Sequence, residues 1–132
     1  MTPRARRNGV LSETVEDEMI VYDSDRARAH RLNRTAAIVW RHADGERTVA
    51  DHAAVLRREL DPAADEDLVW CAIDRLNAAR LLEDQQTRSA ELIRASRRRF
   101  VRKAALVGSM TLLLPVVASI TAPTPADAAS QR

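Results

Sequence analysis

The chain contains little of several residue types on which enzyme sites depend. It has one cysteine and three glycines, and aromatic residues make up 3% of its 132 positions. A single cysteine, Cys71, excludes an internal disulfide and any zinc site that needs two thiolates of one chain. Three glycines leave no glycine-rich phosphate loop, and HExxH, CxxC and nucleophile-elbow motifs are absent. We therefore expect no enzyme activity, no cofactor and no metal site.

Charge is distributed unevenly along the chain. Residues 1–95 hold 15 Arg and 18 Asp and Glu, a net charge of −3, whereas residues 96–132 carry a net charge of +5. The basic character therefore belongs to the C-terminal part. At this length we expect one domain with an appendage. We divide the chain into a flexible arm (1–8), a domain (9–84), a connector (85–95), a basic and apolar segment (96–122) and a flexible tail (123–132).

Residues 10–32 predict three short strands. Val10–Val15, Met19–Tyr22 and Ala27–Leu32 favour β-structure, and polar turns separate them. Two strands alone are only marginally stable in water, so a three-stranded antiparallel meander is the economical interpretation.

Three helices follow. Asn33 stands where a helix cap belongs, and the helix that it opens carries Trp40 as a core residue. Thr48 begins a capping-box pattern for a second helix, which Asp61-Pro62 ends. A third helix starts near residue 65 and has an apolar stripe at helical spacing. The order βββααα predicts an α+β domain resembling a winged helix.

A distinctive run of residues then carries a family resemblance. It consists of Val21-Tyr22-Asp23, then His30-x-Leu32-Asn33-x-Thr35-Ala36-Ala37-x-Val39-Trp40, then Asp44-Gly45 and Thr48-Val49. This pattern resembles the PqqD-like family, small peptide chaperones also called RiPP recognition elements. The resemblance implies three antiparallel strands packed on three helices. It also implies a non-catalytic role, which is to hold the leader of a ribosomally synthesised precursor peptide for a modifying enzyme or a leader peptidase.

The resemblance further implies where the leader binds. Family members take it as an added strand on the third strand, in the groove that this strand makes with the third helix. In this chain the strand residues are Arg28, Ala29, His30, Arg31 and Leu32. The helix residues are Asp67, Trp70, Cys71, Asp74 and Arg75.

Physical arguments support such a site independently. An edge strand offers unpaired N–H and C=O groups to an extended peptide. Arg28, His30 and Leu32 share one face of the strand and Ala29 lies on the other, where its small side chain leaves room for a guest. The arginines suit acidic leader residues, and Trp70 is the type of anchor that binding sites use.

Plainer interpretations stay open for the same residues. The arginines of this strand could simply protect an exposed edge against aggregation. His30 is more typical of a strand surface than of a switch or a metal site, and Trp70 could be buried between neighbouring elements.

The alternative function is a DNA-binding regulator, because winged helices often bind DNA. The N-terminal half of the third helix would then face phosphates, yet it carries Asp65, Glu66 and Asp67. These acids disfavour nucleic acid as a partner, so this hypothesis ranks second.

The C-terminal segment resembles an export signal at the wrong end of the chain. Ser96, Arg97, Arg98 and Phe100 fit a twin-arginine motif, and Ala126 and Ala128 fit a signal-peptidase site. Between them, residues 104–122 are 19 uncharged residues, and a helix of that length spans about 28 Å, close to the membrane's hydrocarbon thickness.

We therefore expect an apolar helix over residues 104–122 that anchors a cytoplasmic domain to the inner membrane, with the C-terminus outside. A relic of a fused export signal is the alternative.

Overall fold

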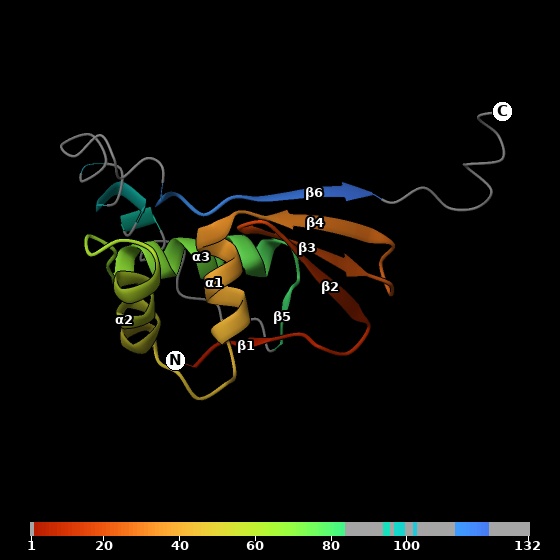
Figure 1. The fold of residues 1–132 in the computed structure, drawn as a ribbon, viewed down its shortest axis with the longest axis horizontal. Helices are drawn as coiled ribbons and strands as arrows, with labels where there is room; N and C mark the ends of the chain where they lie inside the picture. The colour runs from red at the N-terminus through yellow and green to blue at the C-terminus, as the bar shows by residue number, and fades with distance from the viewer. Residues whose placement is uncertain (1, 84–93, 96, 100–101, 103–112, 122–132) are drawn as a thin grey trace, which may run out of the picture.

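The computed structural model describes residues 2–83, 94–95, 97–99, 102 and 113–121 (Figure 1). The strands are β1 (Arg4–Ala5), β2 (Val10–Val15), β3 (Glu18–Asp23), β4 (Arg28–Leu32), β5 (Leu82–Glu83) and β6 (Val117–Thr121). Within residues 2–83 the helices are α1 (Arg34–His42), α2 (Val49–Glu59) and α3 (Glu66–Ala78).

The predicted meander is confirmed. β2 pairs with β3 and β3 pairs with β4, both antiparallel, with Val21 opposite Ser12 on one side and His30 on the other. The β3–β4 turn forms because the Asp23 carboxylate accepts the backbone N–H groups of Asp25 (3.1 Å) and Arg26 (3.3 Å). This local turn fixes the register that points His30 and Leu32 inward.

The three helices and their caps also agree with the sequence patterns. Asn33 caps α1 by accepting from the N–H of Ala36, and Thr48 and Asp51 form a reciprocal capping box at α2. Asp65 caps α3 by accepting from the N–H of Leu68. Each helix therefore begins at a residue whose side chain satisfies a free backbone donor.

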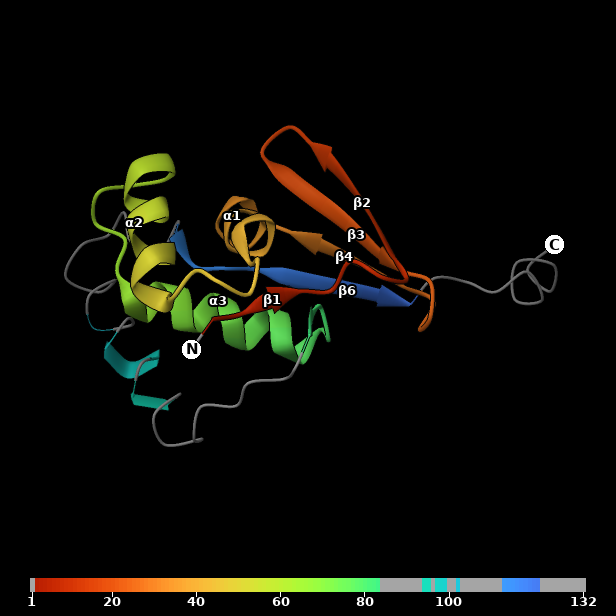
Figure 2. The same ribbon diagram turned by 90° about the horizontal axis from the view of Figure 1, so that it is seen from below.

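The core lies between α1 and the inner face of β3 and β4, and it continues between the three helices, where α2 packs on α1 and α3 (Figure 2). Trp40 is 1% exposed, and its Nε1 donates a hydrogen bond of 3.0 Å to the carbonyl of Leu81. This bond satisfies the indole N–H inside the core. The β2–β3 hairpin extends away from the helices in Figure 2, and the side chains of β2 are almost all exposed.

The N-terminal residues differ from the expected flexible arm. Ala5 is 1% exposed, and β1 pairs antiparallel with β5. The Ala5 N–H also donates to the carbonyl of Ala43 at 2.9 Å. Backbone pairing on both sides, together with burial of Ala5, holds this segment against the end of α1.

The expected apolar helix over residues 104–122 is wrong for residues 117–121, which form β6. Residues 104–112 and 122 lie outside the described residues. β6 pairs antiparallel with β4 and completes a sheet of order β2-β3-β4-β6. Pro115 disfavours a continuing helix, while Val117, Ile120 and Thr121 are β-branched and meet an edge that can pair with them. Of the described helices, none has the length and apolarity needed to cross a membrane.

Candidate functional site

The side chains of β4 divide between the core and the surface. His30 is 2% exposed and Leu32 is fully buried, whereas Arg28 and Arg31 are exposed and Ala29 is half-buried. The shared face of His30 and Leu32 is thus the core face. The backbone on the outer side of Arg28–Leu32, which we call the β4 edge, is the part that a guest strand would use.

The expectation that the third strand has an unpaired outer edge is wrong for this structure, because the chain's own β6 pairs with the β4 edge and makes β4 an inner strand of the sheet. Leu32 lies opposite Val117 and Arg28 lies opposite Thr121. Just before this ladder, the Asn33 N–H donates to the Val116 carbonyl at 3.0 Å. Since the direction of N–H groups alternates along an antiparallel strand, those of Arg31 and Ala29 also face β6.

Asn33 acts at this edge as well as at the helix cap. Its Nδ2 donates to the Leu114 carbonyl at 2.7 Å, and its Oδ1 accepts from Val116 N–H at 3.1 Å. The same Oδ1 accepts from Ala36 N–H at 3.1 Å, as a carbonyl oxygen with two lone pairs can. The sequence indicates the cap, but it carries no signal for the second role, because the partners lie more than 80 positions away.

His30 faces β6 from within the core. Its Nδ1 lies 2.7 Å from the Ser119 hydroxyl, and its Nε2 has no hydrogen-bond partner among the described residues. Burial lowers the pKa of His30 below its ordinary value, against a smaller opposing effect of the Asp23 charge. The imidazole is therefore neutral at pH 7, and the interpretation as a strand-surface histidine is wrong.

The predicted acids of α3 meet arginines of the twin-arginine-like run. Asp67 Oδ1 lies 3.2 Å from Arg99, and Asp74 forms an ion pair with Arg97. Arg98, between them, is exposed. Two carboxylates seven residues apart lie on one flank of α3, two turns from each other, so this flank attracts basic side chains.

The other α3 residues of the predicted site are less accessible. Trp70 is half-buried and packs against the core, whereas Arg75 is exposed in the last helical turn. Cys71 is buried, and burial raises the pKa of its thiol to about 11, so it is a neutral thiol at pH 7.

Four residues of the predicted export signal lie outside the described residues. They are Ser96 and Phe100 of the twin-arginine-like motif and Ala126 and Ala128 of the possible cleavage site.

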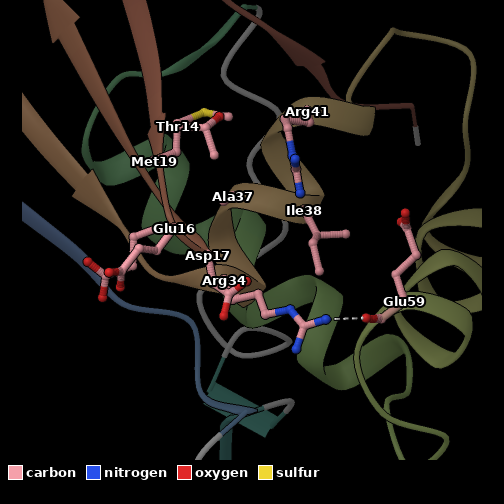
Figure 3. Close-up of a pocket in the computed structure, with 10 residues that line it drawn as sticks. Thr14, Glu16, Asp17, Met19, Arg34, Ala37, Ile38, Arg41 and Glu59 are labelled. Carbon is pink, nitrogen blue, oxygen red and sulfur yellow. Dashed lines mark hydrogen bonds between the residues drawn. The ribbon is translucent and has the colours of Figure 1, made fainter.

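A separate pocket of about 270 Å³ lies between the β2–β3 turn and α1 (Figure 3). Acidic side chains of Glu16 and Asp17 and basic side chains of Arg34 and Arg41 line it. Arg34 donates to the Glu59 carbonyl at 2.8 Å. In the described part of the chain, no group of three His, Cys, Asp or Glu could hold a metal ion.

One comparison with known proteins gave a match. Residues 18–82 match the family model described as Coenzyme PQQ synthesis protein D (PqqD). The searches of the curated proteins and of the solved structures returned no match. The matched range includes β3, β4 and all three of α1, α2 and α3, whereas β6 lies beyond it. The segment that pairs with the β4 edge is thus not part of the region that the family model covers.

Proposed function

Because residues 18–82 form a PqqD-like domain, we propose that this chain is a non-catalytic accessory protein that binds peptides. Its ligand is the leader of a ribosomally synthesised precursor peptide. The leader binds as an extended strand along the β4 edge, and the domain presents the rest of the precursor to a modifying enzyme or leader peptidase.

The pairing of β4 with β6 is the observation that carries this proposal. A strand from beyond the PqqD-like region lies along the β4 edge in antiparallel register over five residue pairs. Main-chain pairing of this kind accepts many sequences, because the hydrogen-bonding groups belong to the backbone. An edge that accommodates one such strand has the geometry to accommodate another.

The acidic flank of α3 supports a preference within the ligand. Asp67 and Asp74 pair with arginines in the structure, so a leader with basic residues finds matching charge there. On the strand side, Arg28 and Arg31 are exposed and suit acidic residues of the bound leader. Both preferences are electrostatic and weaken as salt is added.

No observation favours the alternative of a DNA-binding regulator. The first turn of α3 carries Glu66 and Asp67, which repel a phosphate backbone. Binding of the full chain to duplex DNA at low salt decides this point, and tight association that weakens with salt would reverse the order of the two hypotheses.

We also propose that the domain works in the cytoplasm. A membrane anchor formed by residues 104–122 requires that residues 117–121 leave β4, because one segment cannot pair with the sheet and span a bilayer at the same time. Fractionation of the native cells tests the anchor: full-length chain found only in the soluble fraction contradicts it.

Site-specific cross-linking in the native cell tests the peptide-binding proposal. Arg31 on β4 and Glu13 on β2 lie in one row of the outer sheet face, both opposite Ile20 of β3. A photoreactive p-benzoylphenylalanine replaces either residue. We expect adducts with a precursor leader from position 31 and none from position 13.

Equal capture at both positions, or capture of no peptide at position 31, would contradict strand addition at the β4 edge. Thermal unfolding of each purified variant shows whether the substitution has left the fold intact.

A further inference from the structure

The C-terminal part of the chain contacts both elements of the proposed peptide site. Residues 113–121, which we call the cis segment, run along the β4 edge. Arg97 and Arg99, earlier in the same part, pair with the acids of α3. A bound leader would need the same backbone groups and the same carboxylates.

Main-chain contacts hold most of the cis segment. The ladder with β4 and the hydrogen bonds between Asn33 and the backbone of residues 114 and 116 involve no side chain of the segment. Val116 is 53% exposed and Ile120 is 65% exposed. Interactions that depend on the backbone are available to any extended peptide, so they do not make this segment irreplaceable.

Three side chains give the segment its register. Leu113 is 8% exposed and belongs to the hydrophobic core, and Pro115 is buried as well. Ser119 lies within hydrogen-bond distance of His30. An aliphatic residue at the start and a hydroxyl six positions later therefore describe the segment that this edge accepts.

We propose that residues 113–121 are an intramolecular ligand of the β4 edge, which must leave before an external leader can bind. This inference rests on the proposed function and adds its regulation and ligand class. The competing peptide is extended, has arginines upstream for Asp67 and Asp74, an aliphatic residue in the place of Leu113 and a hydroxyl opposite His30. Weakening the cis segment raises the affinity for such a peptide.

The covalent connection makes this competition strong. A ligand on the same chain binds intramolecularly, and its effective concentration can reach the millimolar range. An external peptide of equal intrinsic affinity is therefore almost excluded at micromolar concentration. Release of the segment, by a partner or by a tighter leader, sets the fraction of molecules that can bind.

The test uses the full chain and a fluorescent synthetic peptide with the sequence of residues 113–121, Leu-Leu-Pro-Val-Val-Ala-Ser-Ile-Thr. Ala118→Pro removes an N–H that alternation directs toward Arg31, so it weakens the cis strand and leaves the β4 edge unchanged. Thr121→Pro is the matched control, because its N–H points away from β4. Fluorescence anisotropy gives the affinities, and hydrogen exchange reports protection of the Ala29 and Arg31 amides.

We expect Ala118→Pro to bind the peptide about tenfold or more tightly than the natural chain, whereas Thr121→Pro stays close to the natural chain. The Ala29 and Arg31 amides should be protected in the natural chain and exchange faster in Ala118→Pro. If Ala118→Pro does not fold, Leu113→Asp serves as a second variant, since a carboxylate in place of a buried leucine expels the segment from the core.

The possible results distinguish a failure of the intramolecular ligand from a failure of the proposed function. Equal and tight peptide binding by the natural chain and Ala118→Pro overturns the intramolecular ligand but keeps the proposed function. Unprotected Ala29 and Arg31 amides in the natural chain also overturn the intramolecular ligand alone. Loss of protection in Ala118→Pro without any peptide binding, together with no leader adduct at position 31, overturns the proposed function and this inference with it.

Discussion

The two outer strands of the predicted meander, β2 and β4, differ sharply in what surrounds them. The described strands include no partner for the outer side of β2, and Leu11 on β2 is 71% exposed. β4 buries His30 and Leu32 and pairs with β6. A strand added to β2 would lie over solvent, whereas one added to β4 lies beside the core and meets the polar groups of Asn33. A free strand backbone therefore holds an added strand best where the core lies beside it and a fixed polar side chain adds hydrogen bonds.

The largest difference between the two strands should appear on truncation of a leucine in each. We expect Leu32→Ala to lower the free energy of unfolding by about 2–5 kcal/mol, because it leaves a cavity in the core. Leu11→Ala should change it by about 0.5 kcal/mol or less, since the side chain is exposed. Urea denaturation of both full-length variants measures this. Similar losses would mean that β2 is buried in solution.

The strand between them gives the second largest effect. The fully buried Asp23 carboxylate of β3 lies 2.8 Å from Arg6 and 3.3 Å from Arg26. We expect Arg6→Ala to cost about 3 kcal/mol, because breaking a buried ion pair leaves a charge without full compensation. Since Asp23 lies opposite both Val10 and Arg28, hydrogen exchange should accelerate on both sides of β3. Faster exchange on only one side of β3 would show that the β2–β3 and β3–β4 pairings open independently of each other.

Protonation of the same Asp23 carboxylate should lower the free energy of unfolding in acid. Burial alone would raise the pKa of Asp23, but hydrogen bonds and charge from Arg6, with help from Arg26, hold it below its ordinary value of 3.8. The folded state thus binds the proton more weakly than the unfolded state. The contribution is present above pH 4 or so and is lost as pH falls through the folded-state pKa. Denaturation between pH 5 and pH 2 checks this, and Asp23→Asn, although less stable, should lack this part of the dependence.

A smaller pH effect should be confined to the β4 side. Burial lowers the pKa of His30, with Arg28 and Arg6 acting in the same direction and Asp23 opposing them. Below the ordinary value of 6.5, protonation favours states in which His30 leaves the core. We expect exchange of the β6 amides to accelerate several-fold between pH 7 and pH 5, after correction for the intrinsic rate.

Two controls isolate this effect. His52 is buried in α2 and its pKa is lowered to about 4, so its protonation also destabilises the whole folded domain as the pH falls. Exchange at β6 is therefore compared with exchange in α2, which reports this general effect. A His30→Gln variant should show no acceleration at β6 beyond that of α2. An unchanged pH response in His30→Gln would remove His30 as the cause.

The smallest expected effect comes from removing a serine hydroxyl, that of Ser119 on β6 or that of Ser12 on β2. Ser119→Ala removes the contact with His30, and we expect the opening of β6 to become easier by about 1 kcal/mol, the usual net value of a hydrogen bond. Ser12→Ala on β2, where the side chain is exposed, should leave exchange unchanged. Equal responses at the two positions would show that the contact between Ser119 and His30 adds nothing to the seating of β6.

Much of the fold and part of the site follow from patterns close together in the chain. Asn33, Thr48 and Asp65 mark the helix starts because a cap depends on residues only two or three positions away. The β4 strand and the acids of α3 could also be located from the sequence. The pairing of Asp67 with Arg99, and of Asn33 with the backbone near Pro115, could not, because no local pattern encodes partners so far apart.

Residues 117–121 illustrate this limit. Hydrophobicity and length favour a helix, and those properties are the same whether the segment lies in a bilayer, in a core or beside a strand. The choice depended on an open β4 backbone, a buried place for Leu113 and the side chain of Asn33, which exist only after the domain has folded. Short-range hydrogen bonding and apolar periodicity thus specify the βββααα domain, while long-range contacts decide what covers its edge, because unpaired backbone groups take whichever partner the folded chain brings to them.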